Sequence, residues 1–232
     1  MNLLELRDVH TFIGQFHILE GVSIDVPEAS VVALLGRNGA GKTTTLKTIL
    51  GLTPAKSGSV VFEGTDITEH RSFDIAGLGI GYVPEHRAIF ADLSVEENLR
   101  IAERRKGDLE RKEDLVFGLF PDLKRLINLP GTSLSGGQQQ MLAVARALVP
   151  DNRLLLIDEP SEGLAPVLIE QMMEAIRSLS EHTTVLLVEQ NFIVASRLGE
   201  TYVIIEEGRS VQSGEMADLV GDEETIQRYL GV

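Results

Sequence analysis

The amino-acid sequence predicts an α/β protein whose core is a mainly parallel sheet. Short apolar segments alternate with helical patterns on both sides of residue 130, as in a sheet covered by helices. Some of these segments are uninterrupted apolar runs, which is typical of strands buried on both faces. Antiparallel strands are predicted at the N-terminus, and a helical subdomain is predicted as an insertion in the core.

The composition restricts where this protein works and what it binds. The longest apolar runs fall far short of the roughly 20 residues of a membrane span. The N-terminus carries acidic residues and lacks the pattern of a signal peptide, and cysteine is absent. We therefore expect a protein of the cytoplasm. The formal net charge of −14 argues against broad binding of nucleic acid.

The first part of the chain is predicted to form strands around one short helix. Apolar residues at every second position predict antiparallel strands near residues 3–9 and 18–26. The apolar run at 30–35 predicts a buried strand, and a helix is predicted to follow from about 41 to 50. Further short strands are predicted at residues 58–64 and 79–84.

The middle of the chain is predicted to be helical. The helical pattern extends from Ser94 to about Ile127, and Ser94 with Glu97 predicts a capping box at its start. The core is predicted at about residues 1–85 and 151–232, and the helical subdomain at about 86–150. The later elements are predicted as strands at 153–158, 183–189, 201–208 and 209–214, with helices at 166–181 and from 191.

A glycine-rich loop, GRNGAGKTT at residues 36–44, lies between a predicted strand and a predicted helix. Such a loop directs backbone N–H groups at phosphate oxygens, and the following helix start adds its dipole. Lys42 is expected to reach the β- and γ-phosphates, Thr43 to bind Mg²⁺, and Thr44 to donate to the α-phosphate. The predicted phosphate-binding residues are Gly36, Asn38, Gly39, Ala40, Gly41, Lys42, Thr43 and Thr44.

Two acidic residues end the predicted strand LLLID and begin the next loop. Asp158 is expected to hold Mg²⁺ through water beside Thr43. Glu159 is expected to orient and deprotonate the water that attacks the phosphate. Ligands of open α/β sheets bind at this carboxyl edge of the strands. The sequence thus predicts a nucleotide hydrolase.

A second glycine-containing stretch, SLSGGQQQML at residues 133–142, also leads into a predicted helix. Met141, Ala145 and Leu148 have the spacing of a buried helix face. A hydroxyl and two glycines at a helix start form an anion site, yet the first loop already binds the phosphates of this chain's nucleotide. A second chain docked head to tail would place the stretch against the γ-phosphate bound by its partner.

The order of these three motifs resembles that of ATP-binding-cassette (ABC) ATPases. LSGGQ at residues 134–138 is similar to the family's signature, and it lies between the phosphate loop and LLLIDEP. The resemblance covers essentially the whole chain. It implies a dimer with two ATP molecules, each held between one phosphate loop and the partner's signature. The signature residues implied to bind ATP in trans are Ser135, Gly136, Gly137 and Gln138.

Further stretches resemble the LivF-type cassettes of branched-chain amino-acid importers. These are VPE…F…LSVEENL, EPSEGLAP and LVEQN. The resemblance implies that Glu85 stands at the Q-loop position, where it holds Mg²⁺-bound water. It also implies that Gln190 stands at the switch position, where its amide donates a hydrogen bond to the γ-phosphate. The D-loop matches residues 161–164, and Glu162 departs from the expected Leu.

The adenine contact is the least specific part of the resemblance. The position of the family's stacking aromatic matches Ile13, which offers a poor π surface. Phe12 and Phe16 are the alternative stacking residues. The other interpretation is that both phenylalanines belong to the core.

The implied function is that of the ATP-binding and ATP-hydrolysing subunit of an importer for branched-chain or related amino acids. The implied partners are a second cassette (identical or LivG-like), two transmembrane permease subunits and, indirectly, a substrate-binding protein. The implied location is the inner face of the membrane. Alternatives are a urea or amide importer, an ABC ATPase of DNA repair or translation, and a regulatory nucleotide binder that does not hydrolyse.

A docking site for the permease is implied beside the Q-loop, at residues 85–93. Ile89 and Phe90 are apolar residues in an otherwise polar loop and would suit a groove that receives a short permease helix. The alternative is that they anchor this loop to the core.

Overall fold

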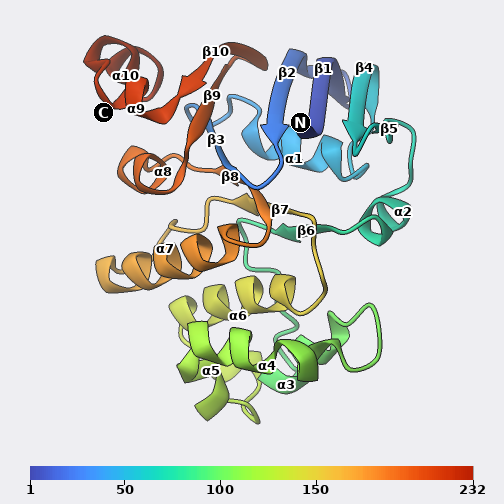
Figure 1. The fold of residues 1–232 in the computed structure, drawn as a ribbon, viewed down its shortest axis with the longest axis vertical. Helices are drawn as coiled ribbons and strands as arrows, with labels where there is room; N and C mark the ends of the chain where they lie inside the picture. Colours follow the sequence, from blue (N-terminus) through green and yellow to red (C-terminus); the bar gives the residue numbers. More distant parts are fainter. Residues whose placement is uncertain (232) are drawn as a thin grey trace.

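The computed structural model describes residues 1–231 (Figure 1). It contains two sheets, and the helix α1 (Lys42–Ile49) packs between them. The antiparallel sheet has the order β2-β1-β4-β5. The other sheet has the order β10-β9-β3-β8-β7-β6. The strands are β1 (Asn2–Ile13), β2 (Phe16–Pro27), β3 (Val31–Leu35), β4 (Ala55–Phe62), β5 (Thr65–Asp66), β6 (Ile80–Val83), β7 (Leu154–Asp158), β8 (Thr184–Val188), β9 (Thr201–Glu206) and β10 (Arg209–Glu215).

The larger sheet confirms the predicted mainly parallel core. Its neighbours from β9 to β6 pair in parallel, and β10 alone runs antiparallel at one edge. Strands β3, β7 and β8 are buried along their full length, as their uninterrupted apolar sequences require. The N-terminal strands β1 and β2 pair antiparallel, as predicted.

Alternate residues of the central strands face two different layers. Val32 and Leu34 of β3 face the layer that contains α1 (Lys42–Ile49) and the antiparallel sheet. Val31 faces the layer formed by α6 (Gly136–Leu148) and α7 (Pro166–Ser180). The helix that follows the phosphate loop and the helix that follows the signature therefore cover opposite faces of the sheet (Figure 1).

The predicted helical stretch after Ser94 is divided into α3 (Val95–Ile101), α4 (Asp108–Leu119) and α5 (Pro121–Arg125). The capping box of Ser94 and Glu97 at the start of α3 is confirmed. Gly107, with a φ of 88°, is the N-cap residue of α4, and the proline at the start of α5 separates α5 from α4. Helices α3 to α6 lie together at one end of the molecule (Figure 1).

The structure contains three helices that the sequence patterns do not predict. They are α2 (Ser72–Gly77), α9 (Met216–Val220) and α10 (Glu223–Tyr229). Each is at most two turns long, which is too short to produce a clear helical period. Helices α9 and α10 pack with α8 (Phe192–Leu198) on the sheet and cover Ala33 and Leu35 of β3.

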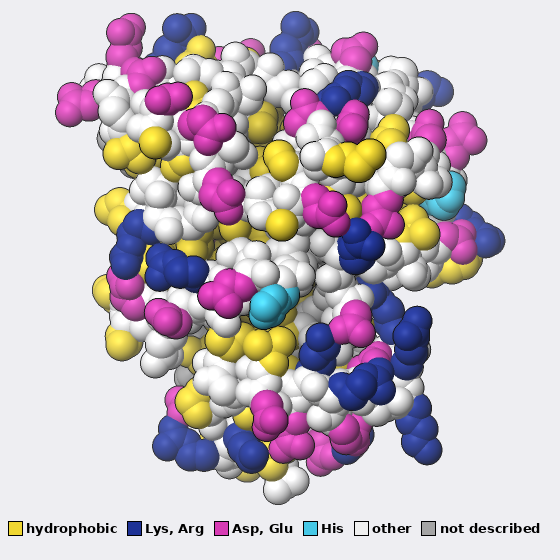
Figure 2. All heavy atoms as spheres, in the orientation of Figure 1, with side chains coloured by type: hydrophobic (Ala, Val, Ile, Leu, Met, Phe, Trp, Pro, Cys, Tyr) yellow, Lys and Arg dark blue, Asp and Glu magenta, His cyan; other side chains and the backbone are white. Residues whose placement is uncertain are grey.

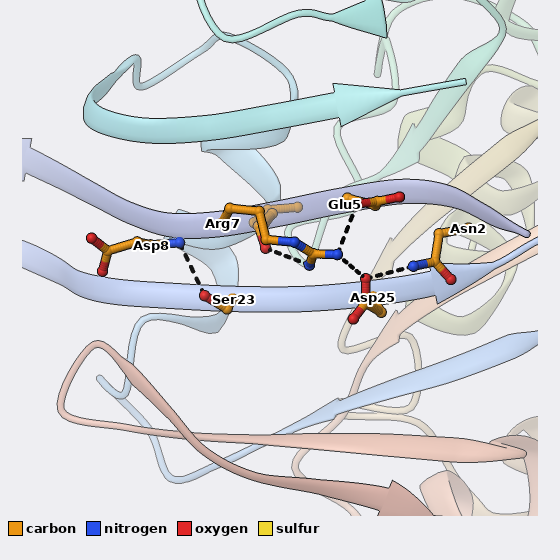
Figure 3. Close-up of polar contacts among 7 residues, drawn as sticks. Asn2, Glu5, Arg7, Asp8, Ser23 and Asp25 are labelled. Atoms are coloured by element: carbon orange, nitrogen blue, oxygen red, sulfur yellow. Dashed lines mark hydrogen bonds and ion pairs between the residues drawn. The ribbon is translucent and has the colours of Figure 1, made fainter. Parts of the chain in front are cut away.

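Polar side chains connect the strands on the outer surface of the antiparallel sheet (Figure 3). The guanidinium of Arg7 donates to Glu5 at 2.7 Å and to Asp25 at 2.6 Å, which joins β1 to β2. The backbone N–H of Ser23 donates to the hydroxyl of Ser210 at 3.0 Å. This last contact connects β2 to β10, and thus one sheet to the other.

Within the described part of the chain, every helix is too short or too polar to span a lipid bilayer.

Candidate nucleotide-binding site

The phosphate loop joins β3 to α1, as predicted, and two of its glycines cannot be replaced without strain. Gly36 has a φ of 149°, and a Cβ there would lie 2.3 Å from the carbonyl oxygen of Ile205. Gly41 has a φ of 111°, and a Cβ there would lie 2.9 Å from the side chain of Leu19. The loop thus takes its shape from positions that only glycine fits well.

The side chain of Lys42 is buried beneath this loop. Its ammonium donates to the carbonyls of Gly36 at 2.9 Å and Arg37 at 3.3 Å, and it forms an ion pair with Glu159 at 3.1 Å. Thr43 and Thr44 are half-buried at the start of α1, while Asn38 and Gly39 are exposed and Ala40 is buried. The fold therefore brings the predicted phosphate-binding lysine and the predicted base together.

Lys42→Ala is expected to abolish tight ATP binding, because the ammonium that would meet the β- and γ-phosphates is removed. Losing one charge-assisted contact of this kind predicts roughly a tenfold or larger loss of affinity. Equilibrium binding of a labelled ATP analogue measures this affinity. Lys47→Ala, on the same helix, is the matched control and should bind normally. Unchanged affinity in Lys42→Ala would mean that the loop has only a structural role.

Asp158 ends β7 with its carboxylate fully buried. It accepts hydrogen bonds from the hydroxyl of Thr43 at 3.1 Å and from that of Tyr82 at 3.3 Å. Burial raises the pKa of Asp158 to about 6, although these two hydrogen bonds act in the opposite direction. The charges of Glu159 and Glu85 contribute further to the rise.

The donor set around Asp158 fits Mg²⁺. A hydroxyl and a carboxylate meet at 3.1 Å, and both are the hard oxygen ligands that this ion prefers. Residues 1–231 contain no group of three or more His, Cys, Asp or Glu side chains arranged to hold a metal. Mg²⁺ commonly takes one or two protein oxygens and completes its shell with phosphate and water.

Glu159 directly follows β7 and adopts an unusual backbone conformation. Its φ of 46° lies in the left-handed region, which non-glycine residues occupy at a cost and often at functional sites. Its N–H donates to the carbonyl of Val188 at 2.9 Å, which fixes the turn against β8. The carboxylate is only 12% exposed and lies beside Lys42.

The carboxyl end of β8 carries Glu189 and Gln190 side by side. Gln190, the predicted switch residue, is exposed at the start of the loop before α8. Glu189 is buried and bonds to Ser161 and Asn191. Neither Glu189 nor Tyr82 is anticipated as a site residue from the sequence. Glu189 could be found by the pattern that identifies Asp158, which is an acidic residue at the end of an apolar strand.

The pKa of Glu189 predicts how stability depends on pH. Burial raises this pKa to about 7 from an ordinary value of 4.5, against the hydrogen bonds from Ser161 and Asn191. Between these values the folded protein keeps a proton that the unfolded chain has lost. The free energy of unfolding should therefore fall as the pH rises from about 5 to 8, by about 3 kcal/mol from Glu189.

Urea unfolding of the wild type and of Glu189→Gln across this pH range measures the effect. The variant should have the flatter profile, because the titrating group has been removed. Identical profiles would contradict the raised pKa.

The second glycine stretch has the geometry of a capped helix start. The hydroxyl of Ser135 accepts from the N–H of Gln138 at 3.3 Å, and the Gln138 side chain accepts from the N–H of Ser135 at 2.8 Å. Ser135 is exposed, so its hydroxyl hydrogen is free to donate outward. A Cβ at Gly137 would lie 2.2 Å from Leu168 of α7, so this glycine permits close helix packing.

The three candidate adenine contacts lie at the tip of the β1–β2 hairpin. Phe12, Ile13 and Phe16 are 42%, 49% and 65% exposed, so the interpretation that the phenylalanines belong to the core is wrong. The ring of Phe12 stacks on His17 with centroids 4.2 Å apart and an interplanar angle of 7°. His17 is thus a further candidate for this surface, and no pattern in the sequence identifies it.

Known proteins are similar to this chain over most of its length. The family model described as "ABC transporter" matches residues 19–162. The high-affinity branched-chain amino acid transport ATP-binding protein BraG of Pseudomonas aeruginosa is 41% identical over 99% of this chain and 100% of its own length. A probable branched-chain amino acid transport ATP-binding protein LivF of Archaeoglobus fulgidus is 36% identical over 94% of both chains.

Solved structures show the same fold. The crystal structure of a nucleotide-free ATP-binding cassette from an ABC transporter aligns with a TM-score of 0.87 over 98% of both chains, at 24% identity. An ATP binding subunit of an ABC transporter aligns with a TM-score of 0.83 over 96% of this chain and 93% of that chain, at 28% identity. This chain belongs to the ABC transporter family, as an ATP-binding and ATP-hydrolysing cassette.

Proposed function

We propose that this chain powers the uptake of branched-chain or related amino acids through separate transmembrane subunits. One observation carries its ATPase role: the ion pair of Lys42 with Glu159 at 3.1 Å, beside the Thr43–Asp158 contact. This geometry gathers a cation, a hydroxyl–carboxylate pair and a second carboxylate at one edge of the sheet, which supports the proposed roles of phosphate binding, magnesium binding and base. The solute follows from the full-length likeness to BraG and LivF.

The proposed chemistry assigns each polar group at the sheet edge a separate role. The backbone of residues 36–44 and Lys42 bind the phosphates, and Lys42 exchanges its present oxygen partners for phosphate oxygens. Glu159, released from Lys42, accepts a proton from the attacking water. Gln190 donates to the γ-phosphate. Thr43 and Asp158, with Glu85 through water, would hold Mg²⁺, which when bound offsets negative charge on the phosphates.

The signature residues are proposed to serve the partner's nucleotide. Exposed Ser135 starts α6, which covers the opposite face of the sheet from α1. The same residues in a second cassette would face the phosphate loop of this chain. We assign about residues 86–150, which contain α3 to α6, to a helical subdomain inserted in the core. The partner is a second cassette, either identical or LivG-like.

A groove between α6 and the core supports docking of a permease subunit. It has a volume of about 410 Å³ and is lined on the core side by Leu52 and Tyr82. Arg87, Ala88 and Arg146 line the other side. Its mixed apolar and basic wall suits a short amphipathic helix of a transmembrane protein. Such docking would hold the chain at the inner face of the membrane, where it acts with two permease subunits and, indirectly, a substrate-binding protein.

The two apolar residues beside this groove differ in their surroundings. Ile89 packs against the core cluster, as the anchoring interpretation requires. Phe90 is 45% exposed, and its ring lies 4.8 Å below the guanidinium of Arg146. Figure 2 shows Lys and Arg side chains on this helical end of the molecule, with Asp and Glu side chains among them. Phe90 is therefore the residue of this pair that remains available to a partner.

Phe90→Asp is expected to weaken co-purification with the transmembrane subunits and to leave ATP binding by the isolated chain unchanged. A carboxylate at this position removes apolar contact from the docking surface. Phe90→Leu is the matched control, since it keeps an apolar side chain, and should assemble normally. Loss of solubility in Phe90→Asp alone would show that Phe90 anchors the loop instead.

Reconstitution tests the proposed function. The chain is purified with the membrane proteins that accompany it, and ATP-driven uptake of labelled leucine or urea into vesicles is measured. Leucine uptake that stops with Lys42→Ala supports the proposal. Uptake of urea alone would identify the alternative importer. Absence of both transport and ATP hydrolysis in the assembled complex would favour a regulatory nucleotide binder.

A further inference from the structure

Glu189 is a buried carboxylate that the proposed chemistry does not use. It is 1% exposed and directly follows β8. Its oxygens accept three hydrogen bonds: from the Ser161 N–H at 3.2 Å, from the Ser161 hydroxyl at 3.0 Å, and from the Asn191 N–H at 3.2 Å. One side chain thus connects the loop after β7 with the loop after β8.

Burial of this group is costly, so its contacts require an explanation. A carboxylate removed from water is tolerated only when several hydrogen bonds satisfy it. Glu189 meets that condition with donors from two separate loops and has no cation among its hydrogen-bond partners. An apolar residue would fill a strand end without this cost, but it would leave the N–H groups of Ser161 and Asn191 without an acceptor.

The two connected loops carry the two proposed catalytic residues. Glu159 lies two residues before Ser161, in the left-handed turn with a φ of 46°. Gln190 lies between Glu189 and Asn191. Strands β7 and β8 are parallel neighbours, and their register pairs Asp158 with Val188. Glu159 and Gln190 therefore leave the same sheet edge from adjacent strands, with Glu189 between their loops.

We infer that Glu189 is a positioning residue that fixes the base Glu159 and the hydrogen-bond donor Gln190 relative to each other at the γ-phosphate. This inference rests on the proposed roles of those two residues. Without the carboxylate, the N–H groups of Ser161 and Asn191 lose their shared acceptor, and the two loops can separate beyond the backbone hydrogen bond of Glu159 to Val188. Phosphate binding depends on the loop at residues 36–44, which Glu189 does not contact through any of its three bonds.

Positioning and a purely structural role predict different kinetics. Displacing a catalytic group by about 1 Å can cost up to about 100-fold in rate while the substrate still binds. A structural defect instead lowers the amount of folded protein, or lowers ATP affinity together with turnover. The kcat for ATP hydrolysis, compared with the KM for ATP, therefore separates the two roles.

The experiment uses the full chain assembled with its co-purifying membrane subunits and compares three variants. Glu189→Gln keeps the size of the side chain but offers only one acceptor oxygen. Glu159→Gln tests the proposed base independently. Thr184→Val is the matched control: Thr184 lies at the start of the same strand, is 2% exposed and accepts from the N–H of Ala29 at 2.9 Å.

At pH 8, above the raised pKa of Glu189, we expect Glu189→Gln to lower kcat about tenfold or more, with the KM for ATP changed less than about threefold. Thr184→Val should lower thermal stability and leave the kcat of the folded protein unchanged. A wild-type kcat in Glu189→Gln, or a parallel loss of ATP affinity, would overturn the inference. A wild-type kcat in Glu159→Gln would instead show that the proposed base is wrong.

Ser161→Ala provides the second test and is decisive if Glu189→Gln does not fold. It removes the hydroxyl that donates to Glu189 and keeps the backbone N–H that also donates. We expect a decrease of about threefold in kcat at constant ATP affinity. An unchanged kcat would overturn the inference.

Discussion

Replacing Glu159 with Gln is expected to lower ATP turnover by about 100-fold or more and to leave ATP binding intact. The amide keeps the size of the side chain but cannot accept a proton from water. The carboxylate is 12% exposed and 3.1 Å from the ammonium of Lys42, so no bulk solvent base can replace it easily. Phosphate release and equilibrium binding of labelled ATP measure the two quantities.

The same variant should accumulate as an ATP-bound dimer that elutes earlier on size exclusion, because the step that separates the cassettes is blocked. Glu162→Gln is the matched control: this exposed acid lies three residues further along the same loop and should hydrolyse ATP normally. Turnover near the wild-type rate in Glu159→Gln would contradict its assignment as the base.

Ser135→Arg is expected to abolish both ATP-dependent dimerisation and hydrolysis, while each chain still binds one ATP with nearly unchanged affinity. Ser135 is exposed at the start of α6, so a larger side chain does not disturb the core. In the proposed dimer, however, Ser135 lies against the partner's γ-phosphate, where a bulky side chain prevents close approach. ATP binding, size exclusion and phosphate release are measured on the same preparation.

Ser135→Ala separates the effect of bulk from the loss of the hydroxyl. It should still dimerise with ATP, and its turnover should lie between those of the wild type and Ser135→Arg. Equal loss of activity in both variants would mean that the hydroxyl alone accounts for the effect.

The sequence predicts best those parts of the site that form within one short segment. The loop at residues 36–44 and the capping box at Ser94 each contain their own hydrogen-bonding partners, so a contiguous motif defines them. The strands of the central sheet were predictable for a related reason. A strand with an uninterrupted apolar sequence, such as β3, is stable only in the interior of a sheet, where both of its faces are buried.

Contacts between distant segments are not predictable in this way. Glu189 and Ser161 are 28 residues apart, and Tyr82 and Asp158 are 76 residues apart. Each pair meets because β6, β7 and β8 are adjacent in the sheet, and strand order is not encoded in any local pattern. Short elements are missed for another reason: α9, at five residues, contains too few apolar positions to define a period.

The most direct test is the ATPase activity of a mixture of two variant chains. It shows whether the phosphate loop of one chain and the signature of another bind the same ATP. Lys42→Ala and Ser135→Arg chains are each expected to be inactive alone. In a mixed dimer, one site pairs the intact phosphate loop of the Ser135→Arg chain with the intact signature of the Lys42→Ala chain. The other site carries both defects.

Mixing the two variants is therefore predicted to restore ATP hydrolysis that neither shows alone, at no more than about half the wild-type rate, since one site of two is intact. ATP binding by monomeric Ser135→Arg should remain close to that of the wild type. Loss of that binding in the monomer would contradict the account, because the second loop would then serve the nucleotide of its own chain.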